Sequence, residues 1–312
     1  MENLIISFNV VLPLFLCIML GYFLRRIHMV DTPSLNKMNQ LCFKVFLPIY
    51  LFNNIATTNL SAAFNAKLLA VAVGGLVGQF FLLMLLIPKI EKENSRRGVL
   101  IQAIFRSNFA LFGLPVALSL CGTENIGPTS LLVGLTVPVF NILAVVTLES
   151  FRGGKPSVKK MLKGIATNPL IIASLIGIVF NVLQISLPSA VQKSVTDLGG
   201  VATPLSLVAL GGSFTVSKVK EYRKQLAIGV SGRLVFSPLL MISIGIAMGF
   251  RNENLIPLLI MSGAPTAVSS FPMAQQMDGD GDLAAGLVVF SSGLAILTMF
   301  LWIFVLKQGG VI

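Results

Sequence analysis

The chain has 312 residues, of which 55% are hydrophobic and only 11% are charged, whereas charged residues make up about a quarter of a soluble globular domain. A soluble enzyme or nucleic-acid-binding domain is therefore excluded, although the formal net charge is +11. Cys17, Cys42, Cys121 and the single histidine show no disulfide or metal-ligand spacing. We expect no enzymatic activity, no metal, no cofactor and no nucleic-acid partner.

Apolar blocks of about 20 residues follow one another along the chain, and each can cross about 30 Å of hydrocarbon as a helix. The second block is interrupted by Lys44 and the seventh by Asp197-Leu-Gly-Gly200. We predict an all-α integral membrane protein embedded in the lipid bilayer. Its ten transmembrane helices are expected at residues 4–24, 37–56, 68–88, 98–121, 128–149, 168–187, 198–216, 226–250, 255–277 and 283–306.

Lysine and arginine are abundant in every second loop. The loops after the first, third, fifth and seventh predicted helices hold sixteen of them, whereas the other loops and the C-terminal end hold only Lys67, Lys193, Arg251 and Lys307. Basic loops stay in the cytoplasm. We therefore predict a multi-pass protein of the plasma membrane with both termini outside the cytoplasm.

The two halves of the chain resemble each other at an offset of about 156 residues. The matched positions are Pro13 and Pro169, Gly21 and Gly177, Pro48 and Pro204 and, one residue further on, Pro115 and Pro272. Chance matches are common in so apolar a chain, but three prolines in register exceed what composition predicts. Because each half has five helices, the halves form inverted repeats, which are typical of alternating-access carriers.

The fourth and ninth predicted helices are interrupted at similar depths from opposite faces of the membrane. A proline removes a helical hydrogen bond, and in lipid the freed backbone groups need protein, water or ligand partners. Broken helices are the usual place of a transporter's substrate site, because half-helix N-termini attract anions; two purely structural kinks are the alternative. The candidate residues are Arg106, Asn108, Gly113 and Pro115 in helix four, and Pro265, Thr266 and Ser269 in helix nine.

Charged residues are distributed unevenly between loops and helices. All twelve Asp and Glu residues fall in loops or at predicted helix ends, which disfavours a proton relay through a buried carboxylate. Lys44, Arg106 and Arg233 lie within predicted helices, about 10–12 Å from the cytoplasmic face, where long side chains reach the surface by snorkelling. Arg106, two residues before Asn108, is the best candidate for attracting a carboxylate.

Three segments carry a family resemblance: Asn108 to Pro115, Gly263 to Ala267, and Pro204 to Gly211. They resemble the auxin efflux carrier family, which includes the plant PIN-FORMED carriers and bacterial malate or malonate permeases. The resemblance covers nearly the whole chain. It implies that Asn108 contacts a carboxylate and that Asn141, on the fifth helix, supplies a second polar contact.

The resemblance also implies the fold of the bile-acid sodium symporters, in which broken helices four and nine cross. Residues 1–66, and residues 151–224 with their basic cytoplasmic loop, would form a scaffold that joins two subunits as a homodimer. Residues 67–150 and 225–312 would form a transport domain that moves like an elevator. One departure is that the third helix, from Ala72 to Gln79, lacks the acidic and basic residues of the plant carriers, so auxin is not assigned as the substrate.

The sequence therefore predicts a secondary transporter whose partner is a small mono- or dicarboxylate anion. The alternatives are an anion channel or sensor on the same fold, and a sodium-coupled symporter of a larger organic anion. A membrane-embedded enzyme would need a nucleophile–base pair or a metal site within the helices, and the sequence shows neither.

Overall fold

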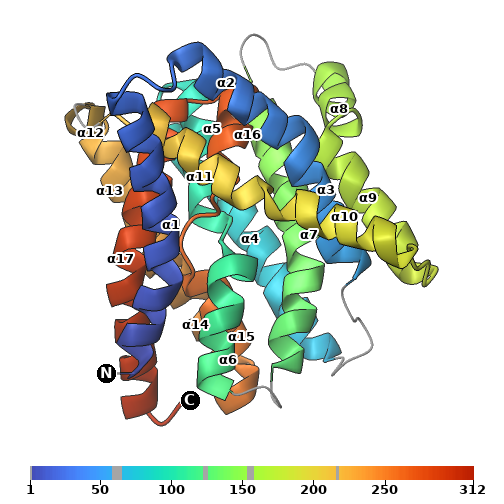
Figure 1. The fold of residues 1–312 in the computed structure, drawn as a ribbon. Coiled ribbons are helices and arrows are strands. Elements are labelled where there is room, and N and C mark those ends of the chain that lie inside the picture. The colour runs from blue at the N-terminus through green and yellow to red at the C-terminus, as the bar shows by residue number, and fades with distance from the viewer. Residues whose placement is uncertain (1, 58–64, 122–125, 153–157, 216–217) are drawn as a thin grey trace.

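The computed structural model describes residues 2–57, 65–121, 126–152, 158–215 and 218–312. Within these residues the regular structure is helical apart from one antiparallel bridge between Ser107 and Thr266, so the predicted all-α class is confirmed. Both chain ends lie at the same end of the molecule, and α2, α8 and α12 lie at the opposite end (Figure 1).

The helices of the first half correspond in order to the first five predicted spans. A long helix with a wider π-helical turn forms the second, and an interrupted helix forms the fourth. The bounds are α1 Glu2–Arg26; α2 Thr32–Leu41, η1 Cys42–Phe46 and α3 Leu47–Ala56; α4 Ala66–Ile90; α5 Asn94–Phe105, η2 Phe109–Gly113 and α6 Leu114–Cys121; and α7 Gly127–Ser150.

The second half begins with a short helix, α8, and its remaining helices correspond in order to the last five predicted helices. The bounds are α8 Val158–Ala166; α9 Pro169–Val182; α10 Ser189–Gly200 and α11 Ala202–Ser213; α12 Lys218–Glu221; α13 Arg223–Ser231, η3 Gly232–Phe236 and α14 Ser237–Ala247; η4 Asn252–Asn254; α15 Ile256–Gly263 and α16 Ser270–Gln276; and α17 Gly281–Gln308. Among the residues that the structure describes, five helices are long and apolar enough to cross a membrane: Ala66–Ile90, Gly127–Ser150, Ser189–Ser213, Arg223–Ala247 and Gly281–Gln308.

Several predicted boundaries were wrong. The second helix begins at Thr32, not residue 37, because the Asp31 carboxylate accepts a hydrogen bond from the Ser34 N–H at 2.8 Å and caps it. The seventh begins at Ser189, not residue 198, so Asp197 lies inside a helix, where it is exposed. The sixth ends at Val182 rather than residue 187, and most of α8 lies between the fifth and sixth predicted helices, where a loop of about residues 150–165 was expected.

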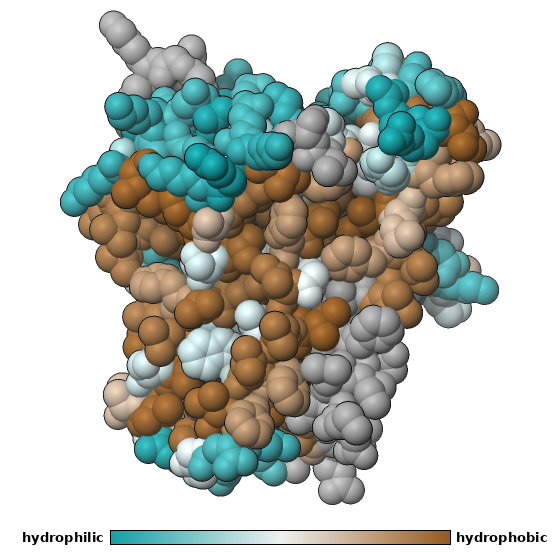
Figure 2. Space-filling model, turned by 90° about the vertical axis from the view of Figure 1, so that its left-hand side faces the viewer, coloured by the Kyte–Doolittle hydropathy of each residue, from teal (hydrophilic) through white to brown (hydrophobic). Residues whose placement is uncertain are grey.

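The surface is divided into an apolar band and two polar ends. In Figure 2 hydrophobic residues cover the middle of the face shown, with hydrophilic residues above and below. Large apolar side chains are exposed on the helices, among them Leu16, Phe81, Leu85 and Leu175. Such a belt is costly in water and suits the hydrocarbon layer of a bilayer.

Glycines allow two pairs of helices to pack closely. A Cβ at Gly21 on α1 would overlap the carbonyl oxygen of Val208 on α11, and a Cβ at Gly177 on α9 would lie 3.1 Å from the carbonyl oxygen of Phe52 on α3. Residues 21 and 177, and likewise residues 52 and 208, are 156 positions apart. The two close contacts are thus related by the same offset as the sequence repeat.

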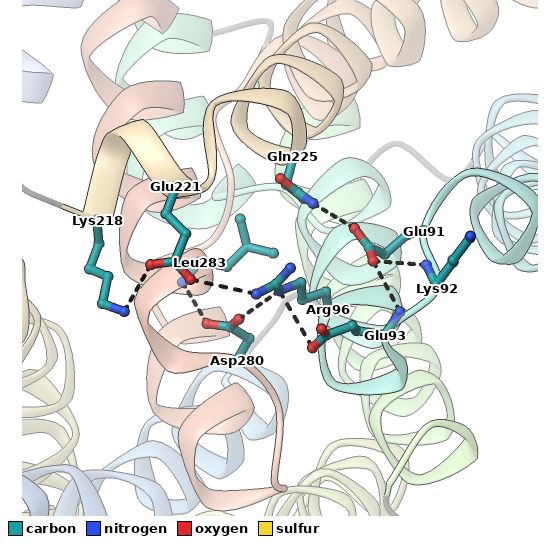
Figure 3. A network of polar contacts seen from close by, with 9 residues as sticks. All are labelled: Glu91, Lys92, Glu93, Arg96, Lys218, Glu221, Gln225, Asp280 and Leu283. Carbon is teal, nitrogen blue, oxygen red and sulfur yellow. Dashed lines mark hydrogen bonds and ion pairs between the residues drawn. The ribbon is translucent and has the colours of Figure 1, made fainter.

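An ionic cluster joins three segments at the end that carries α12 (Figure 3). Arg96 at the start of α5 lies 3.2 Å from Asp280, which caps α17, and 3.7 Å from Glu221 on α12. Glu221 also pairs with Lys218 at 2.9 Å. The cluster connects elements from both halves of the chain.

Candidate functional site

The two interrupted helices cross where each is broken. After α5 and α15 end, the connecting residues run antiparallel: the Asn108 N–H donates to the Pro265 carbonyl at 2.7 Å, and the Ala267 N–H donates to the Arg106 carbonyl at 3.2 Å. These bonds pair backbone N–H and carbonyl groups that the breaks would otherwise leave without hydrogen-bond partners in an apolar interior. The crossing brings residues about 160 positions apart into one site.

A pocket of about 50 Å³ lies beside the crossing. Two helices that are not interrupted complete it, α7 on one side and α11 on the other. Its polar lining comes from Arg106, Ser107 and Asn108 in the first break, Ser269 in the second, Asn141 on α7, Thr203 and Ser206 on α11, and Tyr50 on α3. As far as the structure describes the chain, the polar lining therefore contains one cation, amides and hydroxyls and no carboxylate.

Among the described residues that line the pocket, Arg106 is the only charged one, and its side chain is 4% exposed. Its Nη2 donates to Asn141 Oδ1 at 2.5 Å and to Ser269 Oγ at 2.8 Å, and its Nη1 donates to Ser270 Oγ at 3.2 Å. Among the described residues no Asp or Glu forms an ion pair with it. The snorkelling expected as an alternative is wrong for this residue, because neighbouring helices enclose the guanidinium.

Three buried polar atoms of pocket-lining residues have no hydrogen-bond partner in the described part of the chain: Ser107 Oγ, Asn108 Nδ2 and Asn141 Nδ2. The orientation of the Asn141 side-chain amide follows from its contact with Arg106. A guanidinium only donates, so the amide oxygen must face it, and the amide nitrogen is then left without a partner. An unpaired buried donor costs about 1–3 kcal/mol. One cation and two free amide donors around a single pocket form a site that can accept an anion.

Comparison with known proteins identifies the family of the chain. The model of the family described as "Membrane transport protein" matches residues 6–303. The chain belongs to this family. The predicted membership of the auxin efflux carrier family is confirmed, and the chain is a membrane transporter of that family.

Three relatives match along almost their whole length. An "Uncharacterized transporter" of Methanothermobacter thermautotrophicus is 24% identical over 304 residues, with 96% of this chain and 98% of the relative covered. A "Putative malonate transporter" of Rhizobium meliloti is 22% identical, with 96% of each chain covered. The "Uncharacterized transporter YfdV" of Escherichia coli K12 is also 22% identical, with 94% of this chain and 96% of the relative covered.

Four of the predicted site residues of this transporter line the pocket, namely Arg106, Asn108, Asn141 and Ser269, and the other four do not. Gly113 provides close packing, since a Cβ there would lie 2.8 Å from Ile260 Cγ2 on α15. Pro115 is the second residue of α6, which directly continues the π-helical turn η2. Pro265 supplies the carbonyl of the bridge, and Thr266 Oγ1 donates to the Ala103 carbonyl at 3.0 Å and so caps α5.

Sequence reasoning missed the pocket hydroxyls of Ser107, Thr203 and Ser206 and the guanidinium partner Ser270. Ser107 stands between Arg106 and Asn108, and Ser206 lies in the Pro204 to Gly211 segment that carried the family resemblance. A polar residue within an apolar helix was the available signal, but many such hydroxyls simply bond to their own helix, as Ser206 also does with the Ala202 carbonyl at 2.7 Å.

Proposed function

We propose that this transporter carries small mono- or dicarboxylate anions and binds them in the pocket beside Arg106. The observation that carries the proposal is the buried Arg106 guanidinium, whose partners are an amide and two hydroxyls rather than a carboxylate. A buried charge without a counter-charge is costly. A carboxylate cargo would remove that cost by forming charge-assisted hydrogen bonds with the guanidinium.

The neighbouring donors add selectivity for an anion. Asn108 Nδ2 and Asn141 Nδ2 need acceptors, and a carboxylate has two oxygens that only accept. A cationic cargo would meet the guanidinium without any compensating negative charge in the lining. The same groups therefore favour an acid over an amine.

The dimensions of the pocket favour a small cargo. In this conformation the free volume is about 50 Å³, well below the ~300–1,000 Å³ of typical drug-sized sites. One relative bears the name "Putative malonate transporter", and malonate is a dicarboxylate of this size class. Malonate is therefore the first candidate cargo.

Alternating access in this proposal comes from ten membrane helices arranged as two inverted repeats. The paired glycine contacts of α1 with α11 and of α9 with α3, related by one offset, support the repeat. These helices would form the scaffold, made of residues 1–66 and 151–224. Residues 67–150 and 225–312 would form the transport domain, which carries the crossing past the scaffold as an elevator.

The proposed carrier lies in the plasma membrane with both termini outside the cytoplasm, and two scaffolds join as a homodimer, as the family resemblance implies. The charge distribution supports this orientation, because the segments with α8 and α12 are rich in lysine and lie opposite both termini (Figure 1). A cysteine placed at position 220 should react only with reagents in the cytoplasm. Labelling from outside intact cells would contradict the orientation.

The function is tested by ligand-induced stabilisation of the purified transporter. Because a ligand that binds only the folded state raises the unfolding temperature, malonate and related acids should raise it in a saturable way. Arg106→Gln should weaken binding of the acid about 10–150-fold, corresponding to the ~1.5–3 kcal/mol of a hydrogen bond to a charged group. Saturable uptake of the same acid into proteoliposomes would distinguish a carrier from a channel.

A matched ligand separates charge recognition from packing. The uncharged diamide of malonate should bind weakly to the unaltered transporter and lose little more in Arg106→Gln. Arg106→Lys should recover part of the acid affinity, because it keeps the charge but not the planar fork. Equal losses for acid and diamide would refute the proposed role of Arg106.

A further inference from the structure

A second buried arginine lies behind the crossing, outside the pocket. Arg233 belongs to η3, between α13 and α14, and its side chain is 0% exposed. The snorkelling expected from the sequence is therefore also wrong for Arg233. The preceding Gly232 allows close approach to α5, since a Cβ there would lie 2.8 Å from Ile104 Cδ1.

The Arg233 guanidinium bonds to the C-terminal ends of both half-helices. Its Nη1 donates to the carbonyls of Ile104 and Phe105, both at 2.9 Å, and these are the last two residues of α5. Its Nη2 donates to the Met261 carbonyl at 3.3 Å and to the Ser262 carbonyl, near the end of α15. One side chain thus joins the two broken helices through four main-chain oxygens.

The charges at this place balance without a carboxylate. The C-terminus of a helix carries the equivalent of roughly −0.5 elementary charge, so two converging ends together offset about one positive charge. Arg233 supplies that charge, and no Asp or Glu of the described residues forms an ion pair with it. The arrangement differs from that of Arg106, whose partners are side-chain amide and hydroxyl groups.

Arg233 also completes the hydrogen bonding of α5. The last four carbonyls of a helix lack partners within it. Here the Gln102 carbonyl accepts from the Arg106 N–H and the Ala103 carbonyl accepts from Thr266 Oγ1. The Ile104 and Phe105 carbonyls accept from Arg233. Without the guanidinium, two carbonyls of α5 and two of α15 would lose their partner in the middle of the protein.

Carbonyls at half-helix C-termini are the groups that coordinate sodium in many secondary transporters. We propose that Arg233 is a tethered cation that occupies the position a coupling sodium ion would need at this crossing, so that the transporter binds its cargo without sodium. The residues present do not fit a sodium-coupled symporter at this place, because the guanidinium already uses the carbonyls. The statement about cargo rests on the proposed function, whereas the role of Arg233 in the ligand-free protein does not.

The test measures thermal unfolding of the cargo-free transporter in matched concentrations of sodium, potassium or N-methyl-D-glucamine chloride. Trp302 is a suitable reporter, because it is the single tryptophan and its Nε1 donates to the Leu234 carbonyl at 3.0 Å, next to Arg233. The variants are Arg233→Lys, which keeps a positive charge, and Arg233→Met, which removes it. Arg223→Met is the control, since Arg223 lies exposed at the start of the same helix.

We expect the unaltered protein and Arg223→Met to unfold at the same temperature in all three salts. Arg233→Met should unfold on the order of 10 °C lower, because four buried carbonyls lose their cation. Sodium or potassium, but not N-methyl-D-glucamine, should restore part of this loss by entering the vacated carbonyl cluster. Arg233→Lys should lose less stability than Arg233→Met.

Three results would overturn the proposal. The first is a saturable sodium dependence of the unfolding temperature, or of malonate affinity, in the unaltered protein. The second is an unfolding temperature of Arg233→Lys that is no higher than that of Arg233→Met. The third is a sodium-induced rise in unfolding temperature that is equal in Arg233→Met and Arg223→Met. If Arg233→Met does not fold, the proposal is still tested by the unfolding temperatures of the unaltered protein and of Arg233→Lys in the three salts. Both are then compared with Arg223→Met. If no carboxylate binds in any salt, the proposed function fails while these stability measurements remain decisive for Arg233.

Discussion

Asn108 buries an amide nitrogen that has no acceptor among the residues that the structure describes, although its backbone N–H bonds to the Pro265 carbonyl at 2.7 Å. Asn181, by contrast, uses its amide nitrogen to bind the Ile55 carbonyl at 2.8 Å and so links α9 to α3. Both side chains are buried. They therefore have opposite consequences for folding, which allows binding and structural roles to be separated by experiment.

Asn108→Ala should leave the stability of the cargo-free transporter unchanged or raise it by up to about 1 kcal/mol, because it removes an unsatisfied buried donor. The same change should weaken malonate binding several-fold, since the donor is no longer available to the acid. Asn181→Ala should instead destabilise the protein by about 1–3 kcal/mol with unchanged malonate affinity. Unfolding temperatures with and without malonate measure both effects. A strongly destabilised Asn108→Ala with normal affinity would indicate a structural role.

Single residues also show what the sequence can and cannot predict. Arg106 and Asn108 were identifiable because a cation and an amide are rare within apolar helices. Whether each cationic side chain is buried could not be predicted, since Lys44 is exposed whereas Arg106 and Arg233 are buried. Depth along a helix is encoded locally, but enclosure depends on which other helices pack against that face.

Close approach of α1 and α11 depends on glycine at Gly211, where a Cβ would overlap the carbonyl oxygen of Ile18. Gly211→Ala should therefore force the helices apart and destabilise the protein by about 1–3 kcal/mol or more. Gly200→Ala is the control, because a Cβ there meets nothing within 4 Å, and it should be neutral or slightly stabilising through helix propensity. Unfolding temperatures of the two variants provide the comparison. Equal stability of both would show that α1 and α11 do not pack as described.

The turn between α4 and α5 is fixed by Glu91, whose carboxylate accepts bonds from the N–H groups of Lys92 and Glu93 at 2.8 and 3.0 Å and from Gln225 Nε2 at 2.7 Å (Figure 3). Burial alone would raise the pKa of Glu91, but these hydrogen bonds outweigh it and hold the pKa below its ordinary value of 4.5. The ionised form is therefore favoured by folding. Its stabilising contribution is complete above pH 4.5 and is lost as the pH falls through the lowered folded value.

Glu91→Gln should accordingly be less stable than the unaltered protein at pH 7, by about 1–3 kcal/mol. The difference in unfolding temperature between the two proteins should shrink as the pH falls below 4.5. Glu93→Gln is the control, because the Glu93 side chain is 60% exposed and lies 3.8 Å from Arg96. A difference that stays constant across this pH range would mean that Glu91 ionisation does not contribute.

Element boundaries were predicted least well where polar residues lie inside a helix. The seventh helix was expected to begin after Asp197, yet it starts at Ser189, because exposed polar residues continue its first turns outside the apolar stretch. The interruption of the fourth helix was expected within the segment from Arg106 to Pro115, and it lies at the start of that segment, at residues 106–108. Pro115 lies in the helix that follows the first break rather than in the break itself, whereas Pro265 lies within the second break.

In the whole molecule, the order of the helices and the pairing of the two breaks followed from the sequence, because ten apolar blocks and two proline-containing segments are visible in it. The contacts between the proposed scaffold and transport domain could not be predicted from the sequence. They are made by residues such as Asn36, Asn39 and Gln275. Polar residues of this kind are common in loops and at helix ends, so the sequence does not distinguish those that form contacts. These contacts matter because an elevator mechanism requires them to break.

The contact between α2 and α16 lies at the end of the molecule that carries α12 (Figure 1). Gln275 Nε2 donates to Asn36 Oδ1 at 3.1 Å, and Asn39 Nδ2 donates to Gln275 Oε1. In the proposed division α2 belongs to the scaffold and α16 to the transport domain. If the transport domain slides past the scaffold, these side chains must separate once in every cycle.

Cysteines at positions 36 and 275, introduced into a cysteine-free background and oxidised to a disulfide, should therefore abolish malonate uptake into proteoliposomes, and a reducing agent should restore it. Cysteines at positions 79 and 237 form the matched control. Gln79 and Ser237 lie in the two parts of the proposed transport domain, and their side chains are 3.2 Å apart. Because this pair would move as one body, its disulfide should leave uptake intact. Full uptake with the 36–275 disulfide formed would exclude an elevator movement between these two domains.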